Sequence, residues 1–317
     1  MSEYDKLIGQ LGKMFNISFS LKDWFGTKII GFERGEDPQK TIVISGSAHG
    51  DCENSLYATI DVLLKTEVAN RIVAILSRDP TGFYKLTELS EKIFRKKLSS
   101  VNEMIDYISR MKLTLIEKDG YRILSYGNMA LVFVPEEIKS YRQLETSFNP
   151  RKFDELEGFY LVIPEIWKSS DPRSRTYRIS DDRLFDLDYL YEAPDYMTKL
   201  VDKILEYEPI LFIDFDCWEN NSFCIVTDDW SLQQLDFYID LVLDQIQNKG
   251  IIFLTNSDLK GFSKMREGIY SIKKKVFAKE ISKSGIPFVK FIAPKGDIQL
   301  LATSTLSLIN GLAFVPL

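Results

Sequence analysis

"TIVISGSAHGDCENSLYATIDVLLK", residues 41–65, is the stretch that most strongly indicates the fold of this chain. It begins with five residues that suit a buried strand and continues through a polar loop, residues 46–53. It ends in a pattern of apolar residues at about 3.6-residue spacing, which predicts a helix. A polar loop at the carboxyl end of a strand is a common place for a site in α/β proteins. This loop contains His49, the only histidine of the chain.

The composition describes a protein with a hydrophobic core. The 317 residues suffice for one large domain or two smaller ones. The net charge of −6 gives no overall attraction for nucleic acid or an anionic membrane, and there is no run of about 18 apolar residues that would span a bilayer. The amino terminus has the pattern of an amphipathic helix rather than a signal peptide. Three cysteines fit a reducing compartment better than a disulfide scaffold, so we expect a cytoplasmic protein.

Strand and helix patterns alternate on both sides of this stretch. "RIVAILS" (71–77) predicts a second apolar strand, and "PILFIDFDCW" (209–218) and "PFVKFIAP" (287–294) predict two more, with helical patterns between them. This order predicts an α/β fold with a mixed, mostly parallel twisted sheet flanked by helices. We expect residues 1–83 and 184–317 to form this domain.

Residues 84–136 have a different pattern. Two short helical segments precede strands that are joined by Asp-Gly and Gly-Asn turns, which are hairpin signals. The order helix, helix, hairpin resembles a winged-helix unit, so we expect a small inserted α+β unit here. Residues 85–122 hold nine Lys and Arg against six Asp and Glu, a mild excess that favours packing or partner docking over DNA binding. Residues 137–183 are expected to be a linker or extended insertion.

Five short segments follow one another in a characteristic order. They are "HGDC" (49–52), "DPTG" (79–82), "DLDY" (186–189), "DFD" (214–216) and the strand around Ile292. Together they resemble the zinc carboxypeptidase superfamily, including its succinylglutamate desuccinylase and aspartoacylase branch. In that family the first four segments are His-Gly-Asp-Glu, Asn-Pro-Asp-Gly, Asp-Leu-Asn-Arg and Asp-Leu-His, and the last strand carries a glutamate. The resemblance implies the fold of that family for the regions that flank the insertion.

The resemblance also implies a metal site in which two of the three ligands have changed. His49 would be one zinc ligand, Cys52 stands where the family has Glu, and Asp216 stands where it has the second His. Both replacements shorten the reach toward a metal whose bonds are about 2.0–2.3 Å long, so zinc in the usual place would be under-coordinated. Glu53 is the substitute ligand if the loop moves.

The positions that would carry the family's catalysis and substrate binding have changed too. Ile292 stands at the general-base position and cannot carry a proton. Asp188 and Tyr189 stand where the family's Asn and Arg hold the substrate carboxylate, and a tyrosine cannot form the bidentate clamp of an arginine. With Arg78, these two residues are the candidates for substrate binding.

Several other residues allow two interpretations. Asp214 and Asp216 would project to the same face of a regular strand, or they are acids at a strand end. Cys217 and Cys224 are expected to be buried apolar groups. The run 273–275 is expected to be a solvated helix face rather than an anion site. Two tryptophans, Trp218 and Trp230, are expected to pack in the core rather than line a cleft.

Two functions from different classes remain. The favoured one is a carboxypeptidase-like protein that has lost the zinc hydrolase activity and binds a small molecule, peptide or protein as a binding or regulatory module. The alternative is an active metal-dependent hydrolase with rearranged ligands and zinc, acting on peptide or acyl-amino-acid bonds. Nucleic-acid binding through residues 84–136 is a third, weaker hypothesis.

Overall fold

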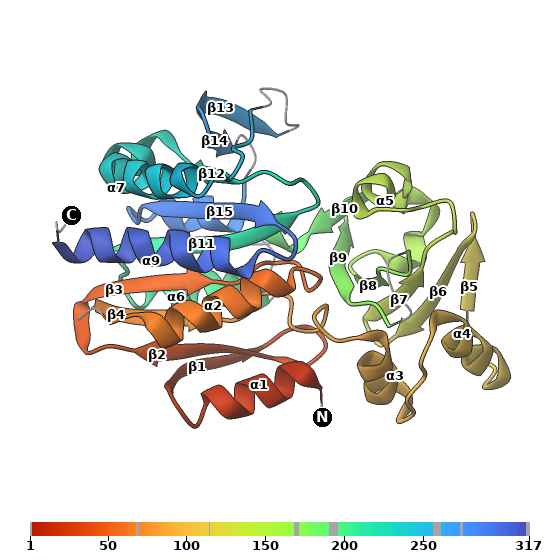
Figure 1. Ribbon diagram of the computed structural model, residues 1–317. Coiled ribbons are helices and arrows are strands. Elements are labelled where there is room, and N and C mark those ends of the chain that lie inside the picture. The colour runs from red at the N-terminus through yellow and green to blue at the C-terminus, as the bar shows by residue number, and fades with distance from the viewer. Residues whose placement is uncertain are drawn as a thin grey trace.

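The computed structural model describes residues 2–67, 70–113, 115–167, 171–189, 196–255, 261–272 and 275–314. These residues form a nine-stranded sheet and a six-stranded sheet that lie beside each other (Figure 1). The first sheet is formed by residues 16–75 and 211–294, and the second by residues 115–186; we refer to residues 84–186 of the structure as the insertion.

The larger sheet has the order β1-β2-β4-β3-β11-β15-β12-β14-β13. Its strands are β1 (Asn16–Lys22), β2 (Lys28–Arg34), β3 (Asp37–Ser45), β4 (Asn70–Ile75), β11 (Leu211–Trp218), β12 (Cys224–Thr227), β13 (Phe262–Arg266), β14 (Ile269–Ile272) and β15 (Phe288–Pro294). Strands β4, β3, β11 and β15 are parallel, as is the pair β12 and β14. The pairs β1–β2, β2–β4, β12–β15 and β13–β14 are antiparallel. The mixed sheet agrees with the prediction, but a mostly parallel sheet is not confirmed, because antiparallel pairs lie on both sides of the central parallel strands.

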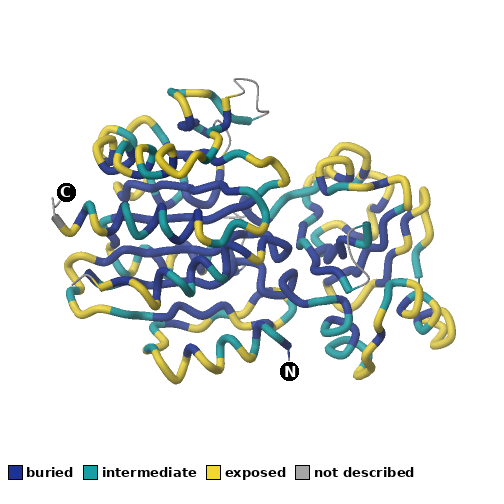
Figure 2. Tube along the Cα trace, viewed as in Figure 1, coloured by how far each residue is buried: buried dark blue, intermediate teal, exposed yellow. Residues whose placement is uncertain are grey.

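Helices cover both faces of this sheet. Helices α2 (Glu53–Lys65), α7 (Asp229–Asn248) and α9 (Ile298–Phe314) pack side by side on the face that is toward the viewer in Figure 1. Helices α6 (Tyr196–Leu205) and α8 (Phe277–Ser282) contact each other on the opposite face, and α1 (Glu3–Leu11) precedes the first strand. The central strands are therefore buried on both sides (Figure 2), as their largely apolar sequences predict. No helix among the described residues is long and apolar enough to cross a membrane.

The smaller sheet has the order β10-β9-β8-β7-β6-β5. Its strands are β5 (Leu115–Lys118), β6 (Tyr121–Tyr126), β7 (Met129–Phe133), β8 (Tyr160–Pro164), β9 (Ser174–Ser180) and β10 (Arg183–Asp186), and its helices are α3 (Leu86–Phe94), α4 (Val101–Arg110) and α5 (Tyr141–Ser147). Short 3-10 segments cover Pro150–Lys152, Asp154–Leu156 and Leu187–Tyr189. The predicted order of helix, helix and hairpin is present in α3, α4, β5 and β6, but the hairpin continues into a wider sheet, so a winged-helix unit is not confirmed. Residues 137–183, expected to be a linker or extended insertion, contribute β8 and β9 to this sheet, and they also form α5.

The two sheets share one hydrophobic core. Along β7, Met129 and Leu131 pack with the core of the larger sheet, whereas Ala130 and Val132 pack with the residues around α5. This alternation is the period of two that a strand imposes on its side chains. The smaller sheet is therefore packed on both faces, and one of those faces is continuous with the main core.

Candidate functional site

The loop between β3 and α2, residues 46–52, is seated by close contacts between backbones. A Cβ atom added at Gly46 would lie 2.0 Å from the carbonyl oxygen of Leu76, and one added at Gly50 would lie 2.0 Å from the carbonyl carbon of Gly82. Only glycine allows such an approach. The two glycines thus bring His49 close to the turn that follows β4.

Asp79 of the "DPTG" turn fastens this loop to the insertion. Its buried carboxylate accepts hydrogen bonds from the backbone N–H groups of Gly50 (3.1 Å), Gly82 (2.9 Å) and Thr176 (3.0 Å). Burial raises the pKa of Asp79 to about 6, although these hydrogen bonds act in the opposite direction. The turn that resembles a family landmark therefore holds three segments together: the His49 loop, the turn itself and β9.

Both ring nitrogens of His49 contact carboxylates. Nδ1 lies 3.0 Å from Oδ1 of Asp216 at the end of β11, and Nε2 lies 2.6 Å from Oδ2 of Asp186 at the end of β10. Burial and the nearby Arg175 guanidinium disfavour the charged ring, but the two carboxylates prevail and raise the pKa of His49 to about 10. His49 is therefore an imidazolium at neutral pH, and each nitrogen donates a hydrogen bond.

Lys290 on β15 inserts a second cation among the carboxylates. Its Nζ lies 2.9 Å from Asp188, 3.0 Å from Asp216 and 3.4 Å from Asp214, and its side chain is 3% exposed. Asp214 and Lys290 are opposite each other in the parallel ladder of β11 and β15, and alternation along β11 places Asp216 on the same face. Burial opposes the ammonium charge, yet these carboxylates hold the pKa of Lys290 well above its usual range.

Arg78 contributes the third cation. Its guanidinium donates to Asp188 (2.9 Å) and, with one terminal nitrogen, to both carboxylate oxygens of Asp214 (2.7 and 2.9 Å). The side chain has no exposed surface and lies over the ring of Phe277, 4.5 Å from its centroid. Arg78 therefore joins the carboxylates of two separate chain segments without contacting solvent.

We call this group the buried ion cluster. Its members are His49, Arg78, Lys290, Asp186, Asp188, Asp214 and Asp216. Three cations thus face four carboxylates in a region from which water is largely excluded, where paired charges interact strongly and unpaired ones are costly.

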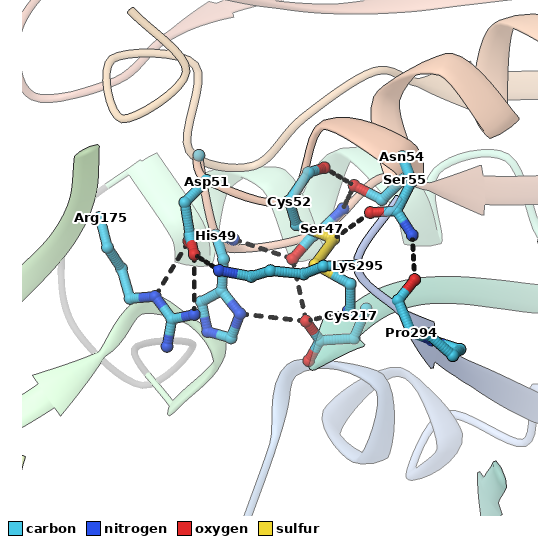
Figure 3. The surroundings of a disulfide bond; sticks show 12 residues. Ser47, His49, Asp51, Cys52, Asn54, Ser55, Arg175, Cys217, Pro294 and Lys295 are labelled. Atoms are coloured by element: carbon cyan, nitrogen blue, oxygen red, sulfur yellow. Dashed lines mark hydrogen bonds and ion pairs between the residues drawn. A yellow bond between two sulfur atoms is a disulfide. The ribbon is translucent and has the colours of Figure 1, made fainter. Parts of the chain in front are cut away.

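The remaining residues expected to bind metal lie outside this cluster. Cys52 is bonded to Cys217 across a Cα–Cα distance of 5.8 Å, which lies within the usual range for a disulfide (Figure 3). This pairing was not expected from the cysteine count, whereas Cys224 is free and buried as predicted. Glu53 is 49% exposed and pairs with Arg173. The sulfur of Cys52 is thus not available as a metal ligand in this structure.

The position predicted for the general base lies in an apolar environment. Ile292 is opposite Asp216 in the β11–β15 ladder and is 4% exposed. It packs with other buried residues, including Cys224, Val226 and Tyr270, and Tyr189 and Trp218 lie partly buried against this group. Trp230, in contrast, is 41% exposed on α7, so the expectation that it packs in the core is wrong. Of the run 273–275, Lys273 and Lys274 lie outside the described residues.

Sequence reasoning missed two of the basic residues of this region. Lys290 had a visible signal, because it is a charged residue in the otherwise apolar strand "FVKFIAP", and a buried charge requires partners. Arg175 had no such signal, since it lies in residues 137–183, which were expected to be a linker or extended insertion. Arg175 donates to Asp51 (3.1 Å), which also pairs with Lys295, as Figure 3 shows.

A cavity of about 660 Å³ lies beside the His49 loop. Its lining residues come from the His49 loop, the start of α2, the insertion and the segment after β15: Asp51, Glu53, Asn54, Lys85, Glu165, Asp171, Pro172, Arg173, Lys295, Gly296 and Ile298. Most of these residues are charged, and Asp51 and Lys295 connect the cavity to the surroundings of the buried ion cluster. We call it the loop cavity.

The fold is similar to that of solved metallo-carboxypeptidases. A metallo-carboxypeptidase from Pseudomonas aeruginosa, in complex with (2-guanidinoethylmercapto)succinic acid, superimposes with a TM-score of 0.53 over 98% of this chain and 68% of the other, at 7% identity. One from Burkholderia cenocepacia gives 0.51 over 96% and 67% at 9% identity. Thrombin activatable fibrinolysis inhibitor gives 0.53 over 98% and 75% at 9% identity. No protein-family sequence model and no curated protein sequence matches the chain.

The chain has a metallo-carboxypeptidase-like fold. At these identities the similarity concerns the fold and leaves the activity open, so the site must be judged on its own residues. Within the described part of the chain, no group of three or more His, Cys, Asp and Glu side chains is placed to hold a metal ion. Both nitrogens of His49 are engaged, and Asp216 is paired with Lys290. With these contacts the carboxypeptidase-like site does not fit a zinc ion.

Proposed function

We propose that this chain is a carboxypeptidase-like protein that has lost the zinc hydrolase activity and acts as a binding or regulatory module. The observation that carries the proposal is the buried ion cluster. Each of its four carboxylates pairs with the lysine, the arginine or the imidazolium, so three of the four negative charges are already balanced without a metal.

The cluster and the neighbouring Ile292 weaken each requirement of metal-assisted hydrolysis. The reaction needs a metal held by three side chains with one open position, and a nearby group that moves a proton. A protonated His49 has no lone pair to give to a metal, and Ile292 has no proton to move. These are separate losses, and reversing one of them would not restore the others.

The loop cavity is the binding site that we propose for this function. Three cationic residues line it (Lys85, Arg173 and Lys295), and four acidic residues face them (Asp51, Glu53, Glu165 and Asp171). Its volume lies within the range of about 300–1,000 Å³ that is typical of small-molecule sites. Such a lining suits a small polar molecule or a peptide end that carries both signs of charge.

Zinc analysis of the purified protein tests the loss of the metal. After incubation with zinc and removal of the excess, we expect clearly substoichiometric metal, and a chelator should leave the unfolding transition unchanged, because bound metal would otherwise stabilise the native state. The matched variant is His49→Gln, which should show the same zinc content. One zinc per chain that is lost in His49→Gln would instead establish the alternative, a metal-dependent hydrolase with rearranged ligands.

The cytoplasmic location expected from the cysteine count also remains a proposal. The Cys52–Cys217 bond is the observation that speaks against it, because disulfides are rare in reducing compartments. Thiol quantification in protein purified under alkylating conditions tests this: three reactive thiols in the denatured protein would support the reducing location.

A further inference from the structure

A second cavity, of about 430 Å³, lies at the junction between the two sheets. It is formed by the loop after β1, the end of α3 and the turn between β6 and β7, and its lining residues are Trp24, Phe25, Lys92, Arg95, Tyr126, Gly127, Asn128 and Met129. None of these residues lines the loop cavity or belongs to the buried ion cluster. We call it the junction cavity. Aromatic and cationic side chains line it, and none of the lining residues carries a carboxylate.

The aromatic rings of the junction cavity are both exposed and held in place. Trp24 is 44% exposed, and it stacks on Tyr160 with ring centroids 5.1 Å apart. Tyr126 is 50% exposed, and its ring makes an edge contact with Phe25 at 6.2 Å. A fixed ring with an open face is a platform on which a planar group can stack. Exposure of two large rings at one cavity would be unfavourable if nothing covered them.

Two cations lie beside these rings. The ammonium group of Lys92 is 4.8 Å from the centroid of Phe25 and 2.8 Å from Oγ1 of Thr27. Arg95 is exposed at the end of α3, and its guanidinium makes no hydrogen bond or ion pair with any described residue. The side-chain amide of Asn128, in the β6–β7 turn, is likewise exposed and unbonded within the described part of the chain. An anionic group would therefore find a free guanidinium, and a polar planar group would find a free amide.

We propose that the junction cavity binds a nucleotide. The base stacks on the exposed rings of Trp24 and Tyr126, its edge meets the amide of Asn128, and the phosphate lies against Arg95 and Lys92. The cavity volume suits one nucleotide. A ligand that carried only a carboxylate would pair with the cations and leave the rings uncovered, whereas a nucleotide uses all three kinds of group.

The same chemistry occurs in free nucleotides and in single-stranded nucleic acid. The chain is acidic overall, which disfavours the wide phosphate contact that duplex DNA requires. Single strands are bound by stacking platforms with a few cations, and this arrangement needs no basic surface around it. The experiment therefore compares AMP and ADP with a short single-stranded oligothymidylate.

Isothermal titration of the full chain with these three ligands tests the proposal. We expect Trp24→Ala and Arg95→Ala each to weaken binding about tenfold, the effect of losing one base stack or one charge-assisted phosphate contact. The matched controls are Trp230→Ala, which removes a similarly exposed tryptophan from α7, and Arg110→Ala, which removes an exposed arginine from the end of α4. Neither control should change the affinity.

Further variants distinguish nucleotide binding from unspecific effects. Trp24→Phe keeps the packing on Tyr160 and should retain most of the affinity of the wild type. Arg95→Lys keeps a positive charge and should bind more tightly than Arg95→Ala.

Adenosine without a phosphate should bind more weakly than AMP, and the affinity of the oligonucleotide should fall with salt. Tighter binding of AMP identifies a free nucleotide, and tighter binding of the oligonucleotide identifies a strand. Absence of binding by all three ligands at millimolar concentration, or equal losses in the control variants, would overturn the proposal.

Discussion

Lys290 shows how one buried cation can pair with several carboxylates at once. Its ammonium group is surrounded by Asp188, Asp214 and Asp216 and is almost completely buried. Removing water from so many charges is costly, and the cost is offset only while each charge has its partner. The cluster is therefore more sensitive to the loss of one member than a surface ion pair would be.

Replacement of this lysine by an apolar residue of similar length should destabilise the protein strongly. We expect Lys290→Met to lower the free energy of unfolding by about 3–5 kcal/mol, because three carboxylates lose their shared cation while they remain buried. Urea denaturation measures this. Lys249→Met, at an exposed position after α7, is the matched control and should change the stability by less than about 0.5 kcal/mol. An equally small change in the unfolding free energy of Lys290→Met would show that the buried carboxylates are stable without the ammonium group.

His49 makes a pH-dependent contribution to stability. Its pKa is about 10 in the folded chain and 6.5 when unperturbed, so the folded state keeps a proton that the unfolded state releases between these values. The contribution is fully present below pH 6.5 and is lost as the pH rises toward 10, with a slope of up to about 1.4 kcal/mol per pH unit. The difference in unfolding free energy between the wild type and His49→Gln should therefore shrink over this window. A difference that stays constant from pH 6.5 to 9 would mean that His49 is neutral.

At the scale of elements, two loops hold the site against the insertion. The "DPTG" turn and the His49 loop touch through backbone atoms, and β9 joins them through Asp79. The bond between Cys52 and Cys217 adds a covalent link between the start of α2 and β11. The position of His49 thus depends on contacts between separate elements rather than on its own loop alone.

The contact between these loops can be tested with one methyl group. Gly50→Ala places a Cβ against the backbone of Gly82, where no flexible side chain can move aside, and we expect a loss of about 3 kcal/mol in unfolding free energy. Gly9→Ala is the matched control, because a Cβ at that position in α1 meets no atom within 4 Å and alanine favours the helix by about 0.5–1 kcal/mol. The midpoint temperature of thermal denaturation should therefore fall in Gly50→Ala and rise in Gly9→Ala.

At the scale of the whole molecule, the two sheets are expected to unfold together. One hydrophobic core includes residues of the larger sheet, such as Ile42 and Phe212, and residues of the smaller one, such as Leu131 and Tyr160. Cooperative unfolding is the usual consequence of a shared core.

Single-tryptophan variants can measure this cooperativity. A variant that keeps only Trp167 reports on the smaller sheet, and one that keeps only Trp230 reports on α7, the remaining tryptophans being replaced by phenylalanine. We expect the urea midpoints of the two fluorescence signals to coincide with each other and with the loss of helical circular dichroism. An earlier midpoint for Trp167 would show that the insertion unfolds as an independent unit.

Much of the larger sheet was predictable because its signals are local. The strands β3, β4, β11 and β15 contain largely apolar runs, and the helix after the His49 loop has clear helical spacing. The smaller sheet was predictable only in its first half, since residues 137–183 have weaker periodicity and β8 pairs with β7 across a long connection. His49, Arg78, Asp188 and Asp216 were recognised as site residues, but the ion pairs between them and their further partners Asp186 and Lys290 were not.

The sequence by itself determined the alternation of strands and helices in the flanking regions and the residue types at each landmark, because these depend on neighbours along the chain. Only the tertiary structure decided which charges meet. His49 pairs with Asp186, 137 residues away, Lys290 pairs with Asp188, 102 residues away, and Cys52 bonds to Cys217 across 165 positions. Pairing energies depend on distance and burial in three dimensions, which residue order does not record.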